Sequence, residues 1–118
     1  MILRIGTLLL GIGLIGLGLG ALLAPEASSE GYGVVSDDRV WIGATGLRDL
    51  VLGMITLVLR QRMPEALPYF LAPLILLPLG DVLLVLTASQ PILHIAPHAL
   101  GAIGIAVLAG LAWRTPNP

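Results

Sequence analysis

Four long apolar stretches, separated by short polar segments, dominate the chain. They cover residues 5–24, 40–59, 67–88 and 91–113. About 20 apolar residues suffice for a helix to cross a bilayer core of roughly 30 Å. Because no water reaches the backbone there, such segments are expected to be helices, and no alternating pattern of barrel strands is present. The sequence therefore predicts an all-α integral membrane protein, an antiparallel four-helix transmembrane bundle that forms a single domain over residues 1–118.

The composition supports a membrane protein and excludes several other classes. Hydrophobic residues make up 57% of the 118 positions and charged residues 11%, with a mean hydropathy of +1.00, whereas soluble domains carry roughly 25% charged residues. A net charge of −1 gives no basic patch for nucleic acid. The absence of cysteine excludes disulfides and cysteine-ligated metals. We predict no cofactor and no metal, with membrane lipids as the surroundings.

Arginine positions predict the orientation in the membrane. The side that would hold both termini carries Arg4, Arg60, Arg62 and Arg114. The opposite side carries only Arg39, within an acidic loop at residues 25–39. Since cytoplasmic loops are enriched in Lys and Arg, both termini are predicted to be cytoplasmic. The lysine-free, Ala/Leu/Gly-rich composition favours a bacterial inner membrane. The acidic loop would lie outside, either folded over the mouth of the bundle or as an ordinary connection.

Small residues recur at helical spacing in two of the predicted spans. In the first, Gly11 and Gly18 are heptad-spaced, and Gly16 and Gly20 form a GxxxG pair. The fourth span carries a stripe of small residues at Ala99, Ala102, Ala106 and Gly110. Such residues let membrane helices approach closely. These two faces could pack against each other within one chain or form a homodimer, so both a monomer and a homodimer remain open.

Two prolines interrupt the third span. Pro73 and Pro78 each remove a backbone hydrogen bond and are expected to kink the helix. A kinked helix in a small bundle leaves room for a cavity. The alternative is that the prolines have no special role, since membrane helices tolerate proline.

Strongly polar residues from three spans fall at one depth. Counted inward from the predicted outer edge, the residues that lie seven or eight positions deep are Arg48, Asp49, Asp81 and His98. At 1.5 Å per residue this is about 10–12 Å below the edge. Charged groups inside a membrane cost several kcal/mol and usually mark a function or a specific pairing. We therefore expect these four side chains to meet.

Helical spacing suggests further members of this group. Thr45, Asp49 and Thr56 follow one another along a helix face, which predicts a polar stripe directed inward. His94 and His98 are four residues apart and hence on one face.

Several interpretations of these residues remain open. The cluster could be a buried ion network that fixes the helices of a scaffold or partner subunit. It could instead line a pocket for a small lipophilic molecule, where a carboxylate beside a histidine is a workable acid–base pair for isomerase-like chemistry. A metal site through His94, His98 and Asp81 is less well supported because structural metals need three or four firm ligands. A small transporter is the remaining alternative, although no inverted repeat is evident.

The second span also carries a resemblance to a known family. The string Gly46-Leu47-Arg48-Asp49-Leu50-Val51-Leu52-Gly53 resembles a domain-of-unknown-function family of small four-span membrane proteins from bacteria and fungi. Members pair this string with a Gly-Asp late in the third span and a histidine in the fourth, matched here by Gly80-Asp81 and His98. The resemblance covers essentially the whole chain. It implies the fold and topology but no activity.

We therefore predict a site in the outer half of the bundle. Asp81 and His98 are the candidate proton donor and acceptor. Arg48 would orient a carboxylate, carbonyl or phosphate group. Asp49, Thr45 and His94 complete the candidate ligand-binding set.

Overall fold

The computed structural model describes residues 1–32 and 37–115, and these are helical almost throughout, with no strand among them. In chain order the elements are α1 (Ile2–Leu23), α2 (Pro25–Gly31), α3 (Arg39–Arg62), η1 (Pro64–Ala66), α4 (Leu67–Leu74), α5 (Leu76–Thr87), η2 (Ile92–Ile95) and α6 (Ala96–Arg114). Four segments are long and apolar enough to span a membrane: Ile2–Leu23, Arg39–Arg62, Pro64–Thr87 and Ile92–Arg114. The predicted all-α membrane bundle is confirmed.

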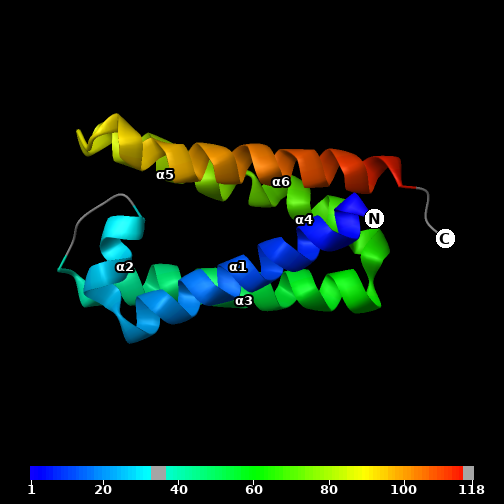
Figure 1. Cartoon of the computed structure of the whole chain (residues 1–118), viewed down its shortest axis with the longest axis horizontal. Helices are drawn as coiled ribbons and strands as arrows, with labels where there is room; N and C mark the ends of the chain where they lie inside the picture. Colours follow the sequence, from blue (N-terminus) through cyan, green and yellow to red (C-terminus); the bar gives the residue numbers. More distant parts are fainter. Residues whose placement is uncertain (33–36, 116–118) are drawn as a thin grey trace.

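The bundle consists of two helical hairpins (Figure 1). Helix α1 packs along α3, and α6 packs along the broken helix α4–α5, while α1 touches α6 only sparingly. The start of α1 and the end of α6 lie at one end of the molecule, which we call the termini end, and α2 lies at the other, the loop end. The hairpins approach each other most closely at the termini end and diverge toward the loop end.

Glycines bring α1 and α3 into backbone contact. A Cβ atom on Gly18 would lie 2.5 Å from the carbonyl oxygen of Gly46, and one on Gly53 would lie 2.7 Å from the carbonyl oxygen of Gly11. Real Cβ atoms do not approach backbone oxygens so closely, so these positions require glycine. Within each helix the two glycines are seven residues apart, Gly11 and Gly18 on α1 and Gly46 and Gly53 on α3. This spacing keeps them on the same face of the helix. In lipid such close packing holds helices together in place of the hydrophobic effect.

The other small residues predicted to pack, the GxxxG pair on α1 and the stripe on α6, do not form the α1–α3 interface. Gly16, from the predicted GxxxG pair, has open space around it. In α6 the predicted stripe is wrong in part, because Ala106 and Gly110 are exposed while Ala109 and Ala112 are buried. The first span pairs with the second span and not with the fourth, since glycines on α3 supply the complementary small face.

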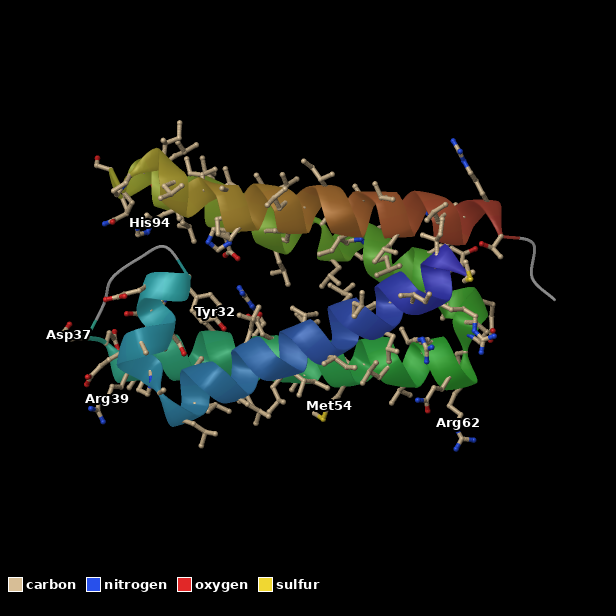
Figure 2. All side chains as sticks on the ribbon, viewed as in Figure 1. Tyr32, Asp37, Arg39, Met54, Arg62 and His94 are labelled. Carbon is tan, nitrogen blue, oxygen red and sulfur yellow. The ribbon has the colours of Figure 1, made fainter. Side chains whose placement is uncertain are left out.

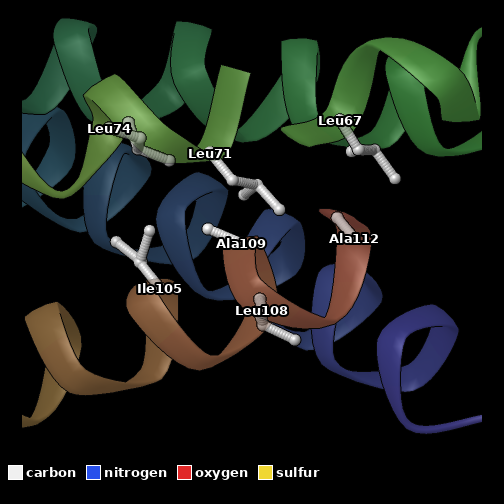
Figure 3. Close-up of a cluster of buried hydrophobic side chains, with 7 residues drawn as sticks. All are labelled: Leu67, Leu71, Leu74, Ile105, Leu108, Ala109 and Ala112. Carbon is white, nitrogen blue, oxygen red and sulfur yellow. The ribbon is translucent and has the colours of Figure 1, made fainter. Parts of the chain in front are cut away.

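The termini end contains the hydrophobic core (Figure 3). Its buried side chains come from α4 and α6: Leu67, Leu71, Leu74, Ile105, Leu108, Ala109 and Ala112. Partly buried leucines from α1 and α3 pack against them. This core joins the two hairpins at the end where their helices converge.

Two connections differ from the prediction. The acidic loop contains a short helix, α2, which begins with Pro25 in its first turn and carries Glu26 there, both favourable at a helix N-terminus. The rest of that loop is partly outside the described residues, namely 33–36. The third span is broken at Ile75, between Pro73 and Pro78, so the predicted interruption by proline is found.

Candidate functional site

Polar side chains from both hairpins meet between the diverging helices, in the half of the bundle nearer the loop end. We call this set the polar cluster: Tyr32, Arg48, Asp49, Asp81 and His98. The four residues expected at one depth are thus brought together. Tyr32, which follows α2, is an additional member.

Asp49 is the tightly held carboxylate of the cluster. Its side chain is 6% exposed. The Tyr32 hydroxyl donates to Oδ2 over 2.9 Å, and Arg48 Nε donates to Oδ1 over 3.0 Å. Arg48 is adjacent in sequence, and its long side chain turns back along the helix to make this contact. Both oxygens of Asp49 are therefore occupied, as a buried charge requires.

Asp81 is held much more loosely. Its Oδ2 lies 3.7 Å from Arg48 Nη2 and 3.6 Å from His98 Nδ1. Both distances exceed a hydrogen bond, and Asp81 makes none to any residue that the structure describes. Its side chain is 24% exposed. A polar group left this way in a membrane protein has room for a further partner.

Tyr32 bridges the two hairpins. Its hydroxyl binds Asp49 on α3, and its backbone carbonyl oxygen lies 2.8 Å from His98 Nε2 on α6. Because a carbonyl oxygen can only accept, Nε2 carries a proton, and the second ring nitrogen, Nδ1, faces Asp81. Burial, reinforced by the negative charge of Asp49 and the hydrogen bond to it, raises the pKa of Tyr32. Tyr32 therefore remains a hydrogen-bond donor at neutral pH.

Sequence reasoning missed the role of Tyr32. The available signal was an aromatic residue between two glycines in an otherwise acidic loop. Figure 2 shows the side chain directed from the end of α2 into the space between the hairpins. The bundle mouth is thus contacted by the loop, one of the two alternatives for this segment.

Two cavities adjoin the polar cluster. The larger, about 350 Å³, lies between the hairpins and has mostly apolar walls, which include Leu10, Gly13, Leu14, Leu17, Leu52, Leu77, Pro78 and Ile105. The smaller, about 80 Å³, lies against Trp41, Thr45, Leu84 and Val85. Tyr32, Arg48, Asp81 and His98 line both cavities. Asp49, the fifth member of the cluster, also lines the larger cavity.

Two residues of the predicted ligand-binding set, Thr45 and His94, are not members of the polar cluster. Thr45 lines the smaller cavity, and its hydroxyl donates to the Trp41 carbonyl oxygen over 3.0 Å. His94 lines neither cavity and lies nearer the loop end (Figure 2), with its Nδ1 buried and unpaired within the described part of the chain.

The predicted inward-facing stripe on the second span is confirmed for Asp49 and Thr56, which share the buried face of α3 with Gly46 and Gly53. Its third member, Thr45, is only half-buried and lines the smaller cavity. Glycine, which hydropathy patterns treat as neutral, defines this face. Among residues 1–32 and 37–115, no three His, Asp or Glu side chains are arranged to hold a metal ion.

Comparison with known proteins assigns a family but no activity. The family model of DUF4267, a domain of unknown function, matches residues 11–112. This range includes all five residues of the polar cluster. No match was found among curated proteins or solved structures.

Proposed function

The chain belongs to the DUF4267 family of unknown function, and we propose that its polar cluster and larger cavity bind a small lipophilic molecule. The observation that carries this proposal is a cavity of about 350 Å³ with apolar walls and a charged rim on one side. Ligand sites typically have volumes of about 300–1,000 Å³, apolar walls and a few convergent polar groups. The cavity is at the lower end of that range.

The contacts within the cluster support separate roles for its two carboxylates. Asp49 has both oxygens occupied by Tyr32 and Arg48 and serves to hold the arrangement. Asp81 has no hydrogen bond to a described residue and faces the cavity beside His98 and the Arg48 guanidinium. In this proposal, Arg48 orients an oxygen of the ligand.

Asp81 and His98 supply acid–base chemistry to the bound molecule. The Tyr32 carbonyl oxygen keeps the proton of the neutral imidazole on Nε2, so Nδ1 is the nitrogen able to accept or return a proton. A carboxylate and an imidazole side by side can move a proton from one position of a substrate to another, as an isomerisation requires. The membrane location fits a substrate that partitions into lipid.

A purely structural ion network is the second candidate, and Asp49 favours it. Its side chain is buried and fully paired, and it connects α3 with the loop at Tyr32. The structural candidate accounts less well for Asp81, which lies beside a cavity with two long ion-pair contacts and no hydrogen bond to a described residue. The two candidates differ in whether a molecule occupies that cavity.

Native mass spectrometry with two glycine variants on α1 tests occupancy. Gly13 lines the larger cavity and Gly16 does not, and both have open space where a side chain would extend. Gly13→Leu should fill the cavity, while Gly16→Leu adds the same side chain elsewhere on the helix. We expect a discrete bound mass on the wild type and on Gly16→Leu, extracted in mild detergent, and its loss from Gly13→Leu. Absence of any bound mass, or equal retention in all three proteins, would contradict the proposal.

We place both termini in the cytoplasm of a bacterial cell, with α2 outside, from the distribution of arginines. The chain has no cysteine, so a single introduced cysteine reports its side of the membrane. In intact cells an impermeant maleimide should label Glu30→Cys and should leave Thr115→Cys unlabelled until the cells are opened. The opposite labelling would reverse the orientation.

A further inference from the structure

The charge balance of the polar cluster identifies the class of head group that the cavity accepts. Asp49 and Arg48 form a close pair, Oδ1 to Nε at 3.0 Å, and their charges cancel. What remains at the cavity is the contact between Asp81 Oδ2 and His98 Nδ1, at 3.6 Å. The number of protons on that pair decides the net charge of the cluster.

The geometry favours one proton on the Asp81–His98 pair. His98 Nε2 already carries a proton, because it faces the Tyr32 carbonyl oxygen at 2.8 Å. With no further proton, Asp81 Oδ2 and the bare Nδ1 would present lone pairs to each other, and the cluster would carry a net charge of −1. One added proton, on either group, makes the contact attractive and brings the cluster to zero. Uncompensated charge is costly among apolar helices, which favours a ligand that adds no charge to the cluster.

The groups left unused at the cavity are hydrogen-bond donors. Arg48 donates through Nε to Asp49, while Nη2 lies 3.7 Å from Asp81, beyond hydrogen-bond distance. Nη1 has no partner among the residues that the structure describes. A ligand oxygen that accepts from the guanidinium would complete the site without changing its charge. An acid would add a negative charge and an amine a positive one.

We propose that the cavity binds an apolar molecule whose head group is an uncharged carbonyl, such as a ketone, aldehyde or ester. The carbonyl oxygen accepts from the Arg48 guanidinium, and the chain of the molecule lies among the leucines of α1. This inference rests on the proposed function and specifies the substrate class of the same site. At about 30 Å³ per non-hydrogen atom, as in liquid water, the cavity volume of about 350 Å³ accommodates about a dozen such atoms.

Three probes of equal carbon number test the head group. Methyl nonyl ketone, undecanoic acid and undecylamine each fill the volume and differ in charge. Binding to the wild type in phosphatidylcholine nanodiscs is measured by isothermal titration at neutral pH, with empty nanodiscs and the cavity-filled Gly13→Leu variant as references. We expect the ketone to bind the wild type at least about tenfold more tightly than either charged probe.

Two arginine variants test the hydrogen bond to the ketone. Arg48→Gln should weaken ketone binding about tenfold. Arg39→Gln removes an exposed arginine paired with Glu26 outside the cluster and should leave ketone binding unchanged. If Arg48→Gln does not fold, the comparison of the three probes on the wild type still decides whether the bound head group is uncharged.

The outcomes separate this inference from the proposed function. If the acid or the amine binds the wild type as tightly as the ketone, and Gly13→Leu abolishes that binding, the carbonyl assignment is wrong and the lipophilic site stands. The carbonyl assignment is also wrong if ketone binding is unaffected in a folded Arg48→Gln protein. If no probe distinguishes the wild type from Gly13→Leu, the site itself is refuted, and the head-group assignment with it.

Discussion

The α1–α3 interface and the space between the two hairpins follow opposite packing rules. Along α1 and α3, glycines at 18 and 46 let the backbones touch, with no room for even a methyl group. The α1–α3 hairpin and the α4–α6 hairpin, by contrast, diverge and leave a cavity of about 350 Å³ beside two carboxylates, an arginine and a histidine. Close packing therefore characterises the inside of the first hairpin, and an open space characterises the region between the hairpins.

The contrast explains why the polar cluster needs Tyr32. Glycine packing holds α1 against α3 through close van der Waals contact, supplemented by a hydrogen bond from Arg60 Nε to the Arg4 carbonyl oxygen. In the diverging half, among the residues that the structure describes, the hairpins are linked by polar contacts instead. Tyr32 connects Asp49 with His98 through hydrogen bonds, and Arg48 Nη2 lies 3.7 Å from Asp81 Oδ2. We interpret the closely packed α1–α3 hairpin as a structural support and the larger cavity between the two hairpins as the functional part.

Breaking the tight interface should have the largest effect. A leucine at Gly18 would drive its Cβ to within 2.6 Å of the Leu50 backbone nitrogen and would force the two helices apart. We expect Gly18→Leu to cost about 3 kcal/mol of folding free energy, measured by thermal melting in detergent. Gly16→Leu on the same helix has open space and should melt near the wild type. Similar melting of the two variants would show that the close approach is not needed.

Removing the bridging hydroxyl should have a moderate effect. Tyr32→Phe deletes the donor to Asp49 and leaves a buried carboxylate oxygen unpaired, so we expect a loss of about 1–2 kcal/mol in the same melting assay. The control is Tyr69→Phe, which removes a hydroxyl from an exposed ring stacked edge-on against Trp113 at the termini end. It should change stability by less than about 0.5 kcal/mol. An equal loss in both variants would mean that the Tyr32 bridge contributes nothing specific.

The smallest effect concerns pH. Burial, with the charge and hydrogen bond of Asp49, raises the pKa of Tyr32 above its ordinary value near 10. Because the folded state holds this proton more tightly than the unfolded state, its contribution to stability is complete below about pH 10 and is lost as the pH rises through the folded-state value.

Phenolate absorbance gives the measurement. In a Tyr69→Phe background, which leaves one tyrosine, the phenolate signal should appear well above pH 10, and adding Asp49→Asn should lower that midpoint. Titration near pH 10 in the folded protein would contradict the hydrogen bond to Asp49.

The sequence predicted the spans and the meeting of the charged residues from simple constraints. Apolar length predicts a spanning helix, and equal depth on three helices brought Arg48, Asp81 and His98 to one level. The directions of individual side chains were harder to predict. Thr45 precedes Asp49 by one helical turn, yet Thr45 is only half-buried while Asp49 is buried, because glycines at 46 and 53 define the buried face of α3. Hydropathy does not identify such a face.

The role of the loop could not be predicted either. Tyr32 is separated from Asp49 by 17 residues and from His98 by 66, and no periodicity relates a loop residue to positions on two helices. The contact depends on where α2 ends, one residue before Tyr32, and that position follows from the packing of α2 against α1 and α3. Tertiary packing of this kind is not encoded in a local pattern.

We propose different roles for the two carboxylates of the polar cluster: Asp49 holds the fold and Asp81 contacts a ligand. Thermal melting of Asp49→Asn and Asp81→Asn, side by side in the same nanodiscs, distinguishes these roles. We expect Asp49→Asn to lower stability by about 2 kcal/mol, since it removes a buried charge paired with Arg48. Asp81→Asn should be as stable as the wild type or more so, as is common where a residue serves function. Equal destabilisation by both changes, or a greater loss from Asp81→Asn, would refute this division of roles and favour a purely structural network.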